Sequence, residues 1–262
     1  MMTKSDPKYQ QLIEYLADLG DAVIAFSGGV DSTFLLKAAH EALGDKVLAV
    51  TVRSPYIPEW EITEARDFTA KLGVKHLIIE VPVADEIINN PENRCYLCKR
   101  FIFEKLRIIA TGKGFKNLAD GTNSDDSADA RPGMKALKEL NVLSPLKENG
   151  FTKPDIRRYS RIMGLPTWEK PAYACLLTRI PYNTPVENDL LRRIEKAEKF
   201  LIDLGIKAVR VRVHGDLARI EIESSMISKI LEENLIKIIS EQLKGFGFKY
   251  VTLDLEGYRE NK

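Results

Sequence analysis

Two groups of residues in this chain have types and spacing suited to chemistry. The first is a six-residue glycine turn made of Ser27, Gly28, Gly29, Val30, Asp31 and Ser32. An apolar run typical of a buried strand precedes it at 22–26, and apolar residues at helical spacing follow it. Glycines let the backbone turn sharply, and the free N–H groups of a helix start attract anions. We therefore predict a phosphate-binding turn, with Asp31 or Ser32 capping the helix.

The second group is the three cysteines. Cys95 and Cys98 form a Cys-x-x-Cys pair that can bring two thiolates to one metal ion or cluster, and Cys175 is distant in sequence. The histidines, at 40, 76 and 214, offer no fourth ligand at a zinc-like spacing. Three thiolates fit an iron–sulfur cluster with one open iron better than a closed zinc site. For the pair alone, two buried packing cysteines are the alternative.

Alternating strands and helices are predicted to position these residues. Apolar runs predict strands at 22–26, 46–52, 75–81 and 117–120. Periodic segments predict helices at 10–19, 33–42, 59–72, 97–111 and 152–163, the last with Thr152 as its cap. This order is typical of an α/β fold with a doubly wound parallel sheet, which binds ligands beyond the carboxyl ends of its strands. The glycine turn lies at that edge.

A polar segment at 121–133 follows the fourth predicted strand and so reaches the same edge of the sheet. We expect its charged side chains to lie over the phosphate ligand, and they are Asp125, Asp126, Asp129 and Arg131. A solvated surface loop is the alternative.

The pattern changes after a proline-rich connector that contains Cys175 and has prolines at 166, 171, 181 and 185. A helix at 187–204, strands at 208–213 and 217–223, a helix at 226–243 and a strand at 250–255 are predicted beyond it. This order is α+β. We therefore predict two domains, a doubly wound domain at 1–180 and a small α+β domain at 181–262.

Charged residues alternate along two of the strands predicted in the small domain. Arg210 and Arg212 share one face of their strand, and Glu221 and Glu223 share one face of the next. The arginines suit a phosphate and the glutamates suit a metal ion or a substrate. A solvated strand face is the alternative for all four.

Composition limits the classes of partner. The 262 residues include 39 basic and 38 acidic side chains, a balance that disfavours nucleic acid as a partner of the whole molecule. No apolar run reaches the length of a membrane span, and the first ten residues lack a signal-peptide core. An odd number of cysteines with a Cys-x-x-Cys pair suggests metal or redox chemistry more than disulfides. We therefore expect a cytoplasmic protein with no membrane partner.

The glycine turn resembles the PP-loop of the ATP pyrophosphatases, enzymes that split ATP between its α- and β-phosphates. No Gly-Lys-Ser/Thr follows the glycines and no GxGxxG is present, which argues against the two commoner nucleotide motifs. Three further stretches, GTNSDDSADARPG, SPLKENGFTKPDIR and LPTWEKPAYACLLTRIPY, make the chain similar to the LarE family from about Gly20 to Glu223. These ATP-dependent sulfur transferases mature the nickel-pincer cofactor of lactate racemase.

The resemblance implies a PP-loop α/β domain, a small C-terminal domain and a homo-oligomer. It also implies a substrate, pyridinium-3,5-biscarboxylic acid mononucleotide, whose carboxylate is adenylylated by ATP and Mg²⁺ before sulfur displaces AMP. By resemblance, ATP is bound by the glycine turn with Asn123, Asp126 and Arg131. Asp31 is assigned to catalysis and, with Glu221, to Mg²⁺. The substrate is assigned to Arg179, Arg210 and Arg212.

The family uses two sources of sulfur, and both involve the Cys175 position. In one, Cys175 surrenders its own sulfur; in the other, Cys95, Cys98 and Cys175 hold a 4Fe-4S cluster whose open iron carries sulfide from an external source. The presence of Cys95 and Cys98 predicts the cluster type. A tRNA-thiolating PP-loop enzyme and a non-enzymatic nucleotide sensor with structural zinc are the remaining alternatives.

Overall fold

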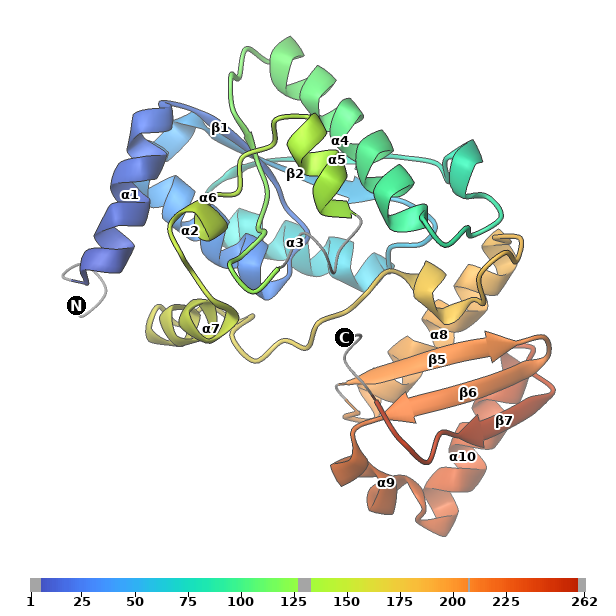
Figure 1. Cartoon of the computed structure of the whole chain (residues 1–262). Helices are drawn as coiled ribbons and strands as arrows, with labels where there is room; N and C mark the ends of the chain where they lie inside the picture. Colours follow the sequence, from blue (N-terminus) through green and yellow to red (C-terminus); the bar gives the residue numbers. More distant parts are fainter. Residues whose placement is uncertain (1–5, 127–132, 207, 259–262) are drawn as a thin grey trace. The chain divides into compact units, whose positions relative to one another are not determined.

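The chain forms two compact units, drawn together in Figure 1. The computed structural model describes residues 6–126, 133–206 and 208–258. The first unit runs to Ala84 and from Asn93 to Ala172, and the second contains Asp85–Glu92 and the chain from Tyr173 onward. No helix in the described ranges is both long and apolar enough to span a membrane.

A parallel sheet is the centre of the first unit. Its strands lie in the order β3-β2-β1-β4, and each neighbouring pair is parallel. The strands are β1 (Ala22–Ala25), β2 (Val47–Arg53), β3 (Lys75–Glu80) and β4 (Leu118–Ala119). The predicted doubly wound parallel sheet is therefore confirmed.

Helices alternate with these strands. They are α1 (Pro7–Leu19), α2 (Val30–Leu43), α3 (Glu59–Leu72), α4 (Arg94–Gly112), α5 (Gly133–Glu139), α6 (Pro145–Glu148) and α7 (Lys153–Ile162). Three of these helices, α4, α5 and α6, differ from expectation. Helix α4 begins three residues before the predicted 97, so both Cys95 and Cys98 lie within its first two turns. The short helices α5 and α6 lie between 133 and 148, where no helix was predicted.

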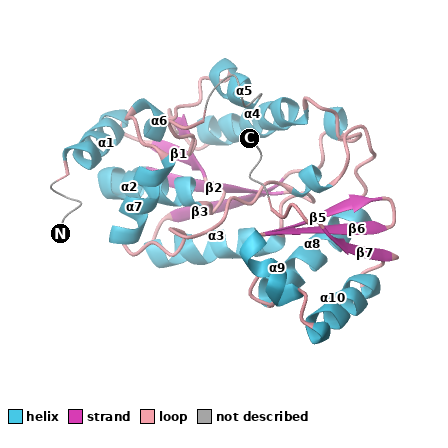
Figure 2. Ribbon diagram, turned by 60° about the horizontal axis from the view of Figure 1, so that its bottom comes forward, coloured by secondary structure: helices cyan, strands magenta, loops and turns pink. Residues whose placement is uncertain are grey.

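Both faces of the sheet are covered, as Figures 1 and 2 show. Along β1, Ala22 and Ile24 pack in one core with α1, α2, α3, α6 and α7, whereas Val23 packs in the other with α4 and α5. Successive strand residues point to opposite faces, so a strand buried on both sides is apolar throughout. This double burial explains why β1 and β2 read as continuous apolar runs in the sequence.

The second unit is an α+β structure. Strands β5 (Val209–His214), β6 (Leu217–Ile222) and β7 (Tyr250–Leu253) form one sheet, in which β5 and β6 are antiparallel and β6 and β7 are parallel. Helix α8 (Asn188–Asp203) contacts β5, and α10 (Glu233–Gly245) contacts β7 (Figure 2). Val209, Val211 and Val213 are buried on one face of β5. The intervening Arg210 and Arg212 therefore point to the opposite face.

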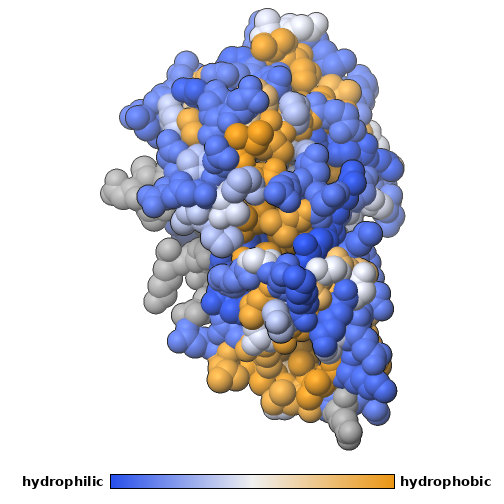
Figure 3. Space-filling model, turned by 90° about the vertical axis from the view of Figure 1, so that its right-hand side faces the viewer, coloured by the Kyte–Doolittle hydropathy of each residue, from blue (hydrophilic) through white to orange (hydrophobic). Residues whose placement is uncertain are grey.

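The single helix predicted at 226–243 is wrong, because the chain forms α9 (Ser224–Ile230) and then α10. Ile230 and Ile239 are both buried. On one continuous helix these residues, nine positions apart, would point in directions about 180° apart at 3.6 residues per turn. The break at Leu231 and Glu232 lets both side chains reach the interior. Figure 3 shows that apolar side chains also gather on the surface of this end of the unit, where Leu231, Ile236 and Ile238 are exposed.

Residues 85–92 belong to the second unit although both flanking segments belong to the first. Asn90 fixes them there. Its fully buried Nδ2 donates to the carbonyl oxygens of Leu177 at 3.3 Å, Ile180 at 3.0 Å and Pro181 at 3.0 Å. The backbone N–H of Val186 adds a 2.7 Å bond to the carbonyl of Ile88. The second unit is thus built from two separate stretches of chain.

Candidate active site

The glycine turn (27–32) connects the carboxyl end of β1 to the start of α2. Gly28 has φ +69°, and a Cβ there would lie 3.4 Å from the Ala65 Cβ of α3, so the turn needs glycine for its left-handed backbone. Gly29, not Asp31 or Ser32, is the N-cap residue, and no side chain caps the helix. The expected capping is therefore wrong, because α2 begins at Val30, three residues before the predicted 33. The N–H groups of this helix start remain available to an anion.

Hydrogen bonds within the glycine turn hold its shape. The Oγ atoms of Ser27 and Ser32 lie 3.1 Å apart, the Gly29 N–H donates to Ser27 Oγ at 3.4 Å, and the Ser32 hydroxyl donates to the Gly29 carbonyl at 3.3 Å. Ser32 is buried, whereas Ser27 is exposed. The turn is thus organised before any ligand binds, with Ser27 at its open side.

A second glycine region packs against this helix start. Gly121 follows β4, and a Cβ on it would lie 2.9 Å from the backbone N of Ser32 and 3.2 Å from the carbonyl carbon of Asp31. Only glycine allows two backbones to approach so closely without displacement. Gly121 was not predicted as a site residue, although a glycine directly after a strand at the ligand-binding edge is a signal for one.

Two lysines from distant segments reach the glycine turn. The ammonium group of Lys153 pairs with Asp31 Oδ2, and that of Lys170 donates to the Gly28 carbonyl at 3.1 Å and pairs with Glu64 at 2.6 Å. Asp31 Oδ1 is buried and has no hydrogen-bond partner within the described residues. Two ammonium groups therefore lie beside the glycine turn, and Asp31 Oδ1 can bind a ligand atom. Both lysines lie in quoted motifs, SPLKENGFTKPDIR and LPTWEKPAYACLLTRIPY, but their roles were not predicted.

The segment after β4 is partly buried, so a fully solvated loop is the wrong interpretation of residues 121–126. Asn123 and Asp126 are buried; Asn123 Oδ1 accepts from the Asp125 N–H at 2.9 Å, and Asp126 Oδ2 accepts from the Asn123 N–H at 3.1 Å. Asp125 Oδ2 accepts from the Lys153 N–H at 2.6 Å, which ties the segment to α7. Nucleotide contacts of Asn123 and Asp126 stay predictions. The expected Asp129 and Arg131 lie outside the described residues.

Helix α7 positions Lys153 through a capping box. Thr152 Oγ1 accepts from the Asp155 N–H while Asp155 Oδ2 accepts from the Thr152 N–H, which confirms the predicted cap. Lys8 also pairs with Asp155 at 2.6 Å. Burial raises the pKa of Asp155, but the hydrogen bonds from Lys8 and Thr152 outweigh it and lower this pKa to about 2. The first turn of α7, with Lys153 as its first residue, is therefore held firmly.

Cys95 and Cys98 lie three residues apart, in the first and second turns of α4, and therefore on one face of the helix. Cys95 is exposed and Cys98 is half-buried, so the alternative of two buried packing cysteines does not apply. Neither forms a disulfide, and the Cys98 Sγ lies 3.3 Å from the Tyr56 hydroxyl. Within residues 6–126, 133–206 and 208–258, no group of three His, Cys, Asp or Glu side chains is arranged as a metal site. Convergence of the pair with Cys175, in the second unit, stays a prediction.

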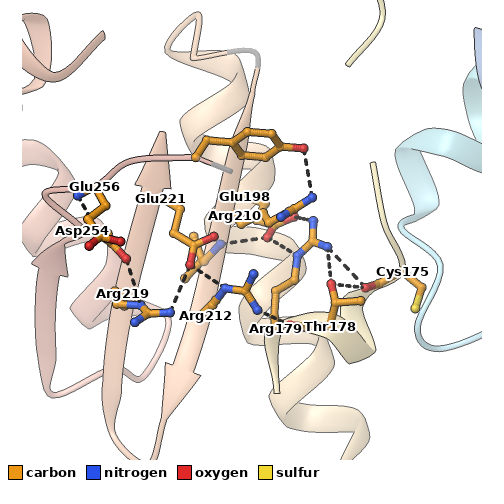
Figure 4. A network of polar contacts seen from close by, with 12 residues as sticks. Cys175, Thr178, Arg179, Glu198, Arg210, Arg212, Arg219, Glu221, Asp254 and Glu256 are labelled. Carbon is orange, nitrogen blue, oxygen red and sulfur yellow. Dashed lines mark hydrogen bonds and ion pairs between the residues drawn. The ribbon is translucent and has the colours of Figure 1, made fainter. Parts of the chain in front are cut away.

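Cys175 lies near the start of a tight turn, residues 174–179, which we call the Cys175 turn. Arg179 at its end is 2% exposed and bound to Glu198 of α8 (Figure 4). Burial lowers the pKa of Arg179, but its ion pair with Glu198 outweighs burial and raises it, so the guanidinium keeps its charge. A side chain so enclosed has no surface for a substrate. The contacts of Arg179 favour a structural role over the expected substrate contact.

The face of the second sheet opposite its helices carries three arginines, Arg210, Arg212 and Arg219, which we call the arginine face (Figure 4). Glu221 joins two of them, because its Oε1 accepts from Arg212 Nε at 2.5 Å and from Arg219 Nη2 at 3.1 Å. Arg210 and Glu221 are buried. The solvated-face alternative is therefore wrong for these two, and an anion site fits better.

Two further observations refine this face. Arg210 lies over the Tyr258 ring at 4.4 Å, and burial lowers the pKa of its guanidinium. Glu223 is not part of the strand, because β6 ends at Ile222 and Glu223 is the exposed N-cap residue of α9. The expected shared face of Glu221 and Glu223 is therefore wrong. Binding of Mg²⁺ by Glu221 stays a prediction, although its carboxylate already serves two arginines.

Comparisons with known proteins match this architecture. A family model described as "Queuosine biosynthesis protein QueC" matches residues 21–92, which include the glycine turn. The chain is 37% identical to "Pyridinium-3,5-bisthiocarboxylic acid mononucleotide synthase" of Lactiplantibacillus plantarum, over 97% of this chain and 93% of that protein. It is 38% identical to "Uncharacterized protein slr1717" of Synechocystis sp., over 98% and 97%. It is 36% identical to "Uncharacterized protein MJ0830" of Methanocaldococcus jannaschii, over 90% of each.

Proposed function

We propose that this chain, which belongs to the LarE family, is an ATP-dependent sulfur transferase in the synthesis of the nickel-pincer nucleotide cofactor. The observation that carries the proposal is 37% identity to the bisthiocarboxylic acid mononucleotide synthase over 97% of the chain. The glycine turn, the two lysines beside it and the arginine face supply the groups that such a reaction needs.

The proposed substrate is pyridinium-3,5-biscarboxylic acid mononucleotide. In the first half-reaction a substrate carboxylate oxygen attacks the α-phosphorus of ATP, the bond to pyrophosphate breaks, and an acyl adenylate forms. In the second, a sulfur nucleophile attacks the acyl carbon and AMP leaves with the electron pair of the carbon–oxygen bond. Adenylylation is needed because oxide is a poor leaving group, whereas AMP is a good one.

The first unit is suited to the first half-reaction. N–H groups at the start of α2 and the ammonium groups of Lys153 and Lys170 can stabilise the charge that develops on departing pyrophosphate. The buried, unpartnered Oδ1 of Asp31 fits a ligand atom for Mg²⁺. When bound there, Mg²⁺ would neutralise phosphate oxygens. Asp31 would then bridge the metal ion and Lys153.

The second unit is suited to recognition of the substrate phosphate. Arg212 is half-buried and is held by Glu221 and by the Thr178 carbonyl, to which its Nη1 donates at 2.8 Å. A guanidinium fixed in this way presents its remaining N–H groups in a defined direction, which suits a phosphomonoester. Arg210 and Arg212 are thus proposed as substrate residues, with Glu221 orienting Arg212.

The cysteines fit the cluster type of sulfur source. Cys95 and Cys98, on one face of α4 and without a disulfide, can ligate the same group, and Cys175 is proposed as the third ligand. A 4Fe-4S cluster held by these three thiolates would supply the transferred sulfur. We also propose a homo-oligomer, an external sulfide source and a cytoplasmic location, in line with the family resemblance.

The test is an anaerobic assay of the full chain with ATP, Mg²⁺, sulfide and the pyridinium mononucleotide, read by mass spectrometry. We expect AMP and the thiocarboxylate in equal amounts over several turnovers, and loss of the thiocarboxylate in Cys95→Ala with adenylylation retained. Iron and acid-labile sulfide are measured in the same preparation. Absence of any substrate-dependent AMP would contradict the function.

Other outcomes would select the alternatives. A single turnover with loss of one sulfur from the intact mass would identify Cys175 as a sacrificial donor. Zinc without iron or labile sulfide, and no turnover, would favour a nucleotide sensor. ATP-dependent thiolation of tRNA would replace the small-molecule substrate by a nucleic acid.

A further inference from the structure

We propose that Arg179 and Glu198 are positioning residues that fix the Cys175 turn for sulfur transfer. The proposal rests on the proposed function in one respect, that the sulfur is held or donated at Cys175. Neither residue has to contact the substrate for the reaction to occur. Every group in the argument lies within the second unit.

The Arg179–Glu198 pair is enclosed and doubly bonded. Arg179 Nε donates to Glu198 Oε1 at 2.7 Å and Nη2 donates to Oε2 at 2.9 Å, with side chains 1% and 0% exposed. Two parallel bonds set the plane of the guanidinium as well as its distance. The Val211 N–H of β5 also donates to Glu198 Oε1 at 2.9 Å. The carboxylate is therefore anchored both to α8 and to the sheet, and the guanidinium takes its orientation from it.

The third nitrogen of the same guanidinium holds the Cys175 turn. Arg179 Nη1 donates to the Ala174 carbonyl at 2.8 Å, to the Cys175 carbonyl at 3.3 Å and to Thr178 Oγ1 at 2.8 Å. Thr178 also bonds to the Cys175 carbonyl, to which its N–H donates at 3.1 Å and its hydroxyl donates at 3.0 Å. Figure 4 shows the bonds that join Arg179, Thr178 and Cys175, beside the Cys175 sulfur. The backbone of Cys175 is thus fixed from the side away from its thiol.

The burial of this pair indicates positioning more than stability. A buried ion pair recovers its desolvation cost only with good geometry, and apolar residues of similar volume often stabilise as well. An apolar pair could not, however, donate to the carbonyls of Ala174 and Cys175. A displacement of about 1 Å of a reacting group can reduce a rate about a hundredfold, so fixing this backbone matters for the second half-reaction. The first half-reaction requires no contact with the turn.

The decisive variant is Arg179→Lys. Lysine keeps the charge beside Glu198 but has one nitrogen where arginine uses three. We expect substrate-dependent ATP–pyrophosphate exchange to change less than about twofold while thiocarboxylate formation falls about tenfold to a hundredfold. Lys199→Ala is the matched control. Lys199 follows Glu198 directly on α8, and its replacement removes only an exposed ion pair with Asp203. It should leave both rates unchanged.

A second readout needs neither cluster nor turnover. In the reduced, metal-free protein with Cys95 and Cys98 replaced by Ala, the rate of alkylation of Cys175 by iodoacetamide reports the placement of its thiol. We expect Arg179→Lys and Thr178→Val each to change this rate at least about threefold, with the far-UV circular dichroism unchanged. If Arg179→Lys fails to fold, the alkylation rate of Thr178→Val alone tests the positioning of Cys175.

Unchanged alkylation rates and an unchanged ratio of the two half-reactions, in folded variants, would overturn the positioning role. An equal loss of both half-reactions would also overturn it, because a general structural role would produce that result. If the wild type forms no thiocarboxylate at all, the proposed function fails, whereas the alkylation rates still test the positioning of Cys175.

Discussion

The ammonium group of Lys153 pairs with the carboxylate of Asp31, 122 residues earlier in the chain. The pair joins the first residue of α7 to the first turn of α2. It brings a cation to a glycine turn that has no lysine in its own sequence. A phosphate-binding loop usually carries its lysine within the motif; here the tertiary structure supplies it.

Replacing Lys153 by Ala is expected to slow adenylylation about a hundredfold, because a charge aimed at departing pyrophosphate is lost in a site that is preorganised for it. Pyrophosphate release in the presence of the mononucleotide measures this effect. Lys135→Ala on α5, which removes an exposed pair with Glu139, is the control and should keep the wild-type rate. Equal rates in the two variants would show that Lys153 contributes only to structure.

The Asp31→Asn variant should raise the Mg²⁺ concentration needed for half-maximal pyrophosphate release by about tenfold or more, since a neutral amide is a weak Mg²⁺ ligand. Asp31 makes no capping hydrogen bond, so its loss otherwise removes its ion pair with Lys153 and a helix-dipole interaction of about 0.3–1 kcal/mol. A Mg²⁺ titration at saturating ATP separates the two effects. Asp67→Asn on the exposed side of α3 serves as the control. An unaltered titration curve would exclude Asp31 as a metal ligand.

At Gly121, an added methyl group would meet backbone atoms of Ser32 and Asp31 at 2.9 and 3.2 Å. Gly121→Ala should therefore destabilise the protein by about 1–3 kcal/mol and weaken ATP binding, because the helix start must shift. Urea unfolding and calorimetric titration with ATP measure the two effects. Gly112→Ala offers the comparison, since a Cβ there meets nothing within 4 Å. Wild-type affinity in Gly121→Ala would contradict the proposed contact between this loop and the turn.

The capping box of α7 predicts a pH dependence. The folded pKa of Asp155 is about 2, below the 3.8 of an unperturbed aspartate, so its contribution to stability is complete above pH 4 and lost as the pH falls toward 2. Asp155→Asn should lower the free energy of unfolding by about 1–2 kcal/mol at pH 7, and this difference should vanish near pH 2. Chemical denaturation at a series of pH values measures it. A difference that is independent of pH would contradict the assigned ion pair with Lys8.

Much of the first unit could be predicted because its signals are local. The apolar runs of β1 and β2 reflect burial on both faces, and the glycines at 28 and 29 mark the turn between β1 and α2. The period-two spacing of Arg210 and Arg212 correctly placed both on one face of β5. In each case the residues of one short stretch of sequence were enough to predict the local structure.

The parts that escaped prediction depend on contacts far apart in the chain. Nothing near Lys170 indicates that its side chain reaches the Gly28 carbonyl, 142 positions away. Arg179 was assigned to the substrate by resemblance, and no residue near it in the sequence indicates its buried ion pair with Glu198. Likewise, no glycine or proline marks the break between α9 and α10, which follows from the need to bury Ile230 and Ile239 together.

The placement of 85–92 in the second unit has a consequence for exchanging parts between relatives. A hybrid gene joined once, near residue 172, would combine 85–92 from one parent with 173 onward from the other. Asn90 would then face foreign carbonyls in place of those of Leu177, Ile180 and Pro181. A functional chimaera therefore requires both segments of the second unit, 85–92 and 173 onward, from the same parent.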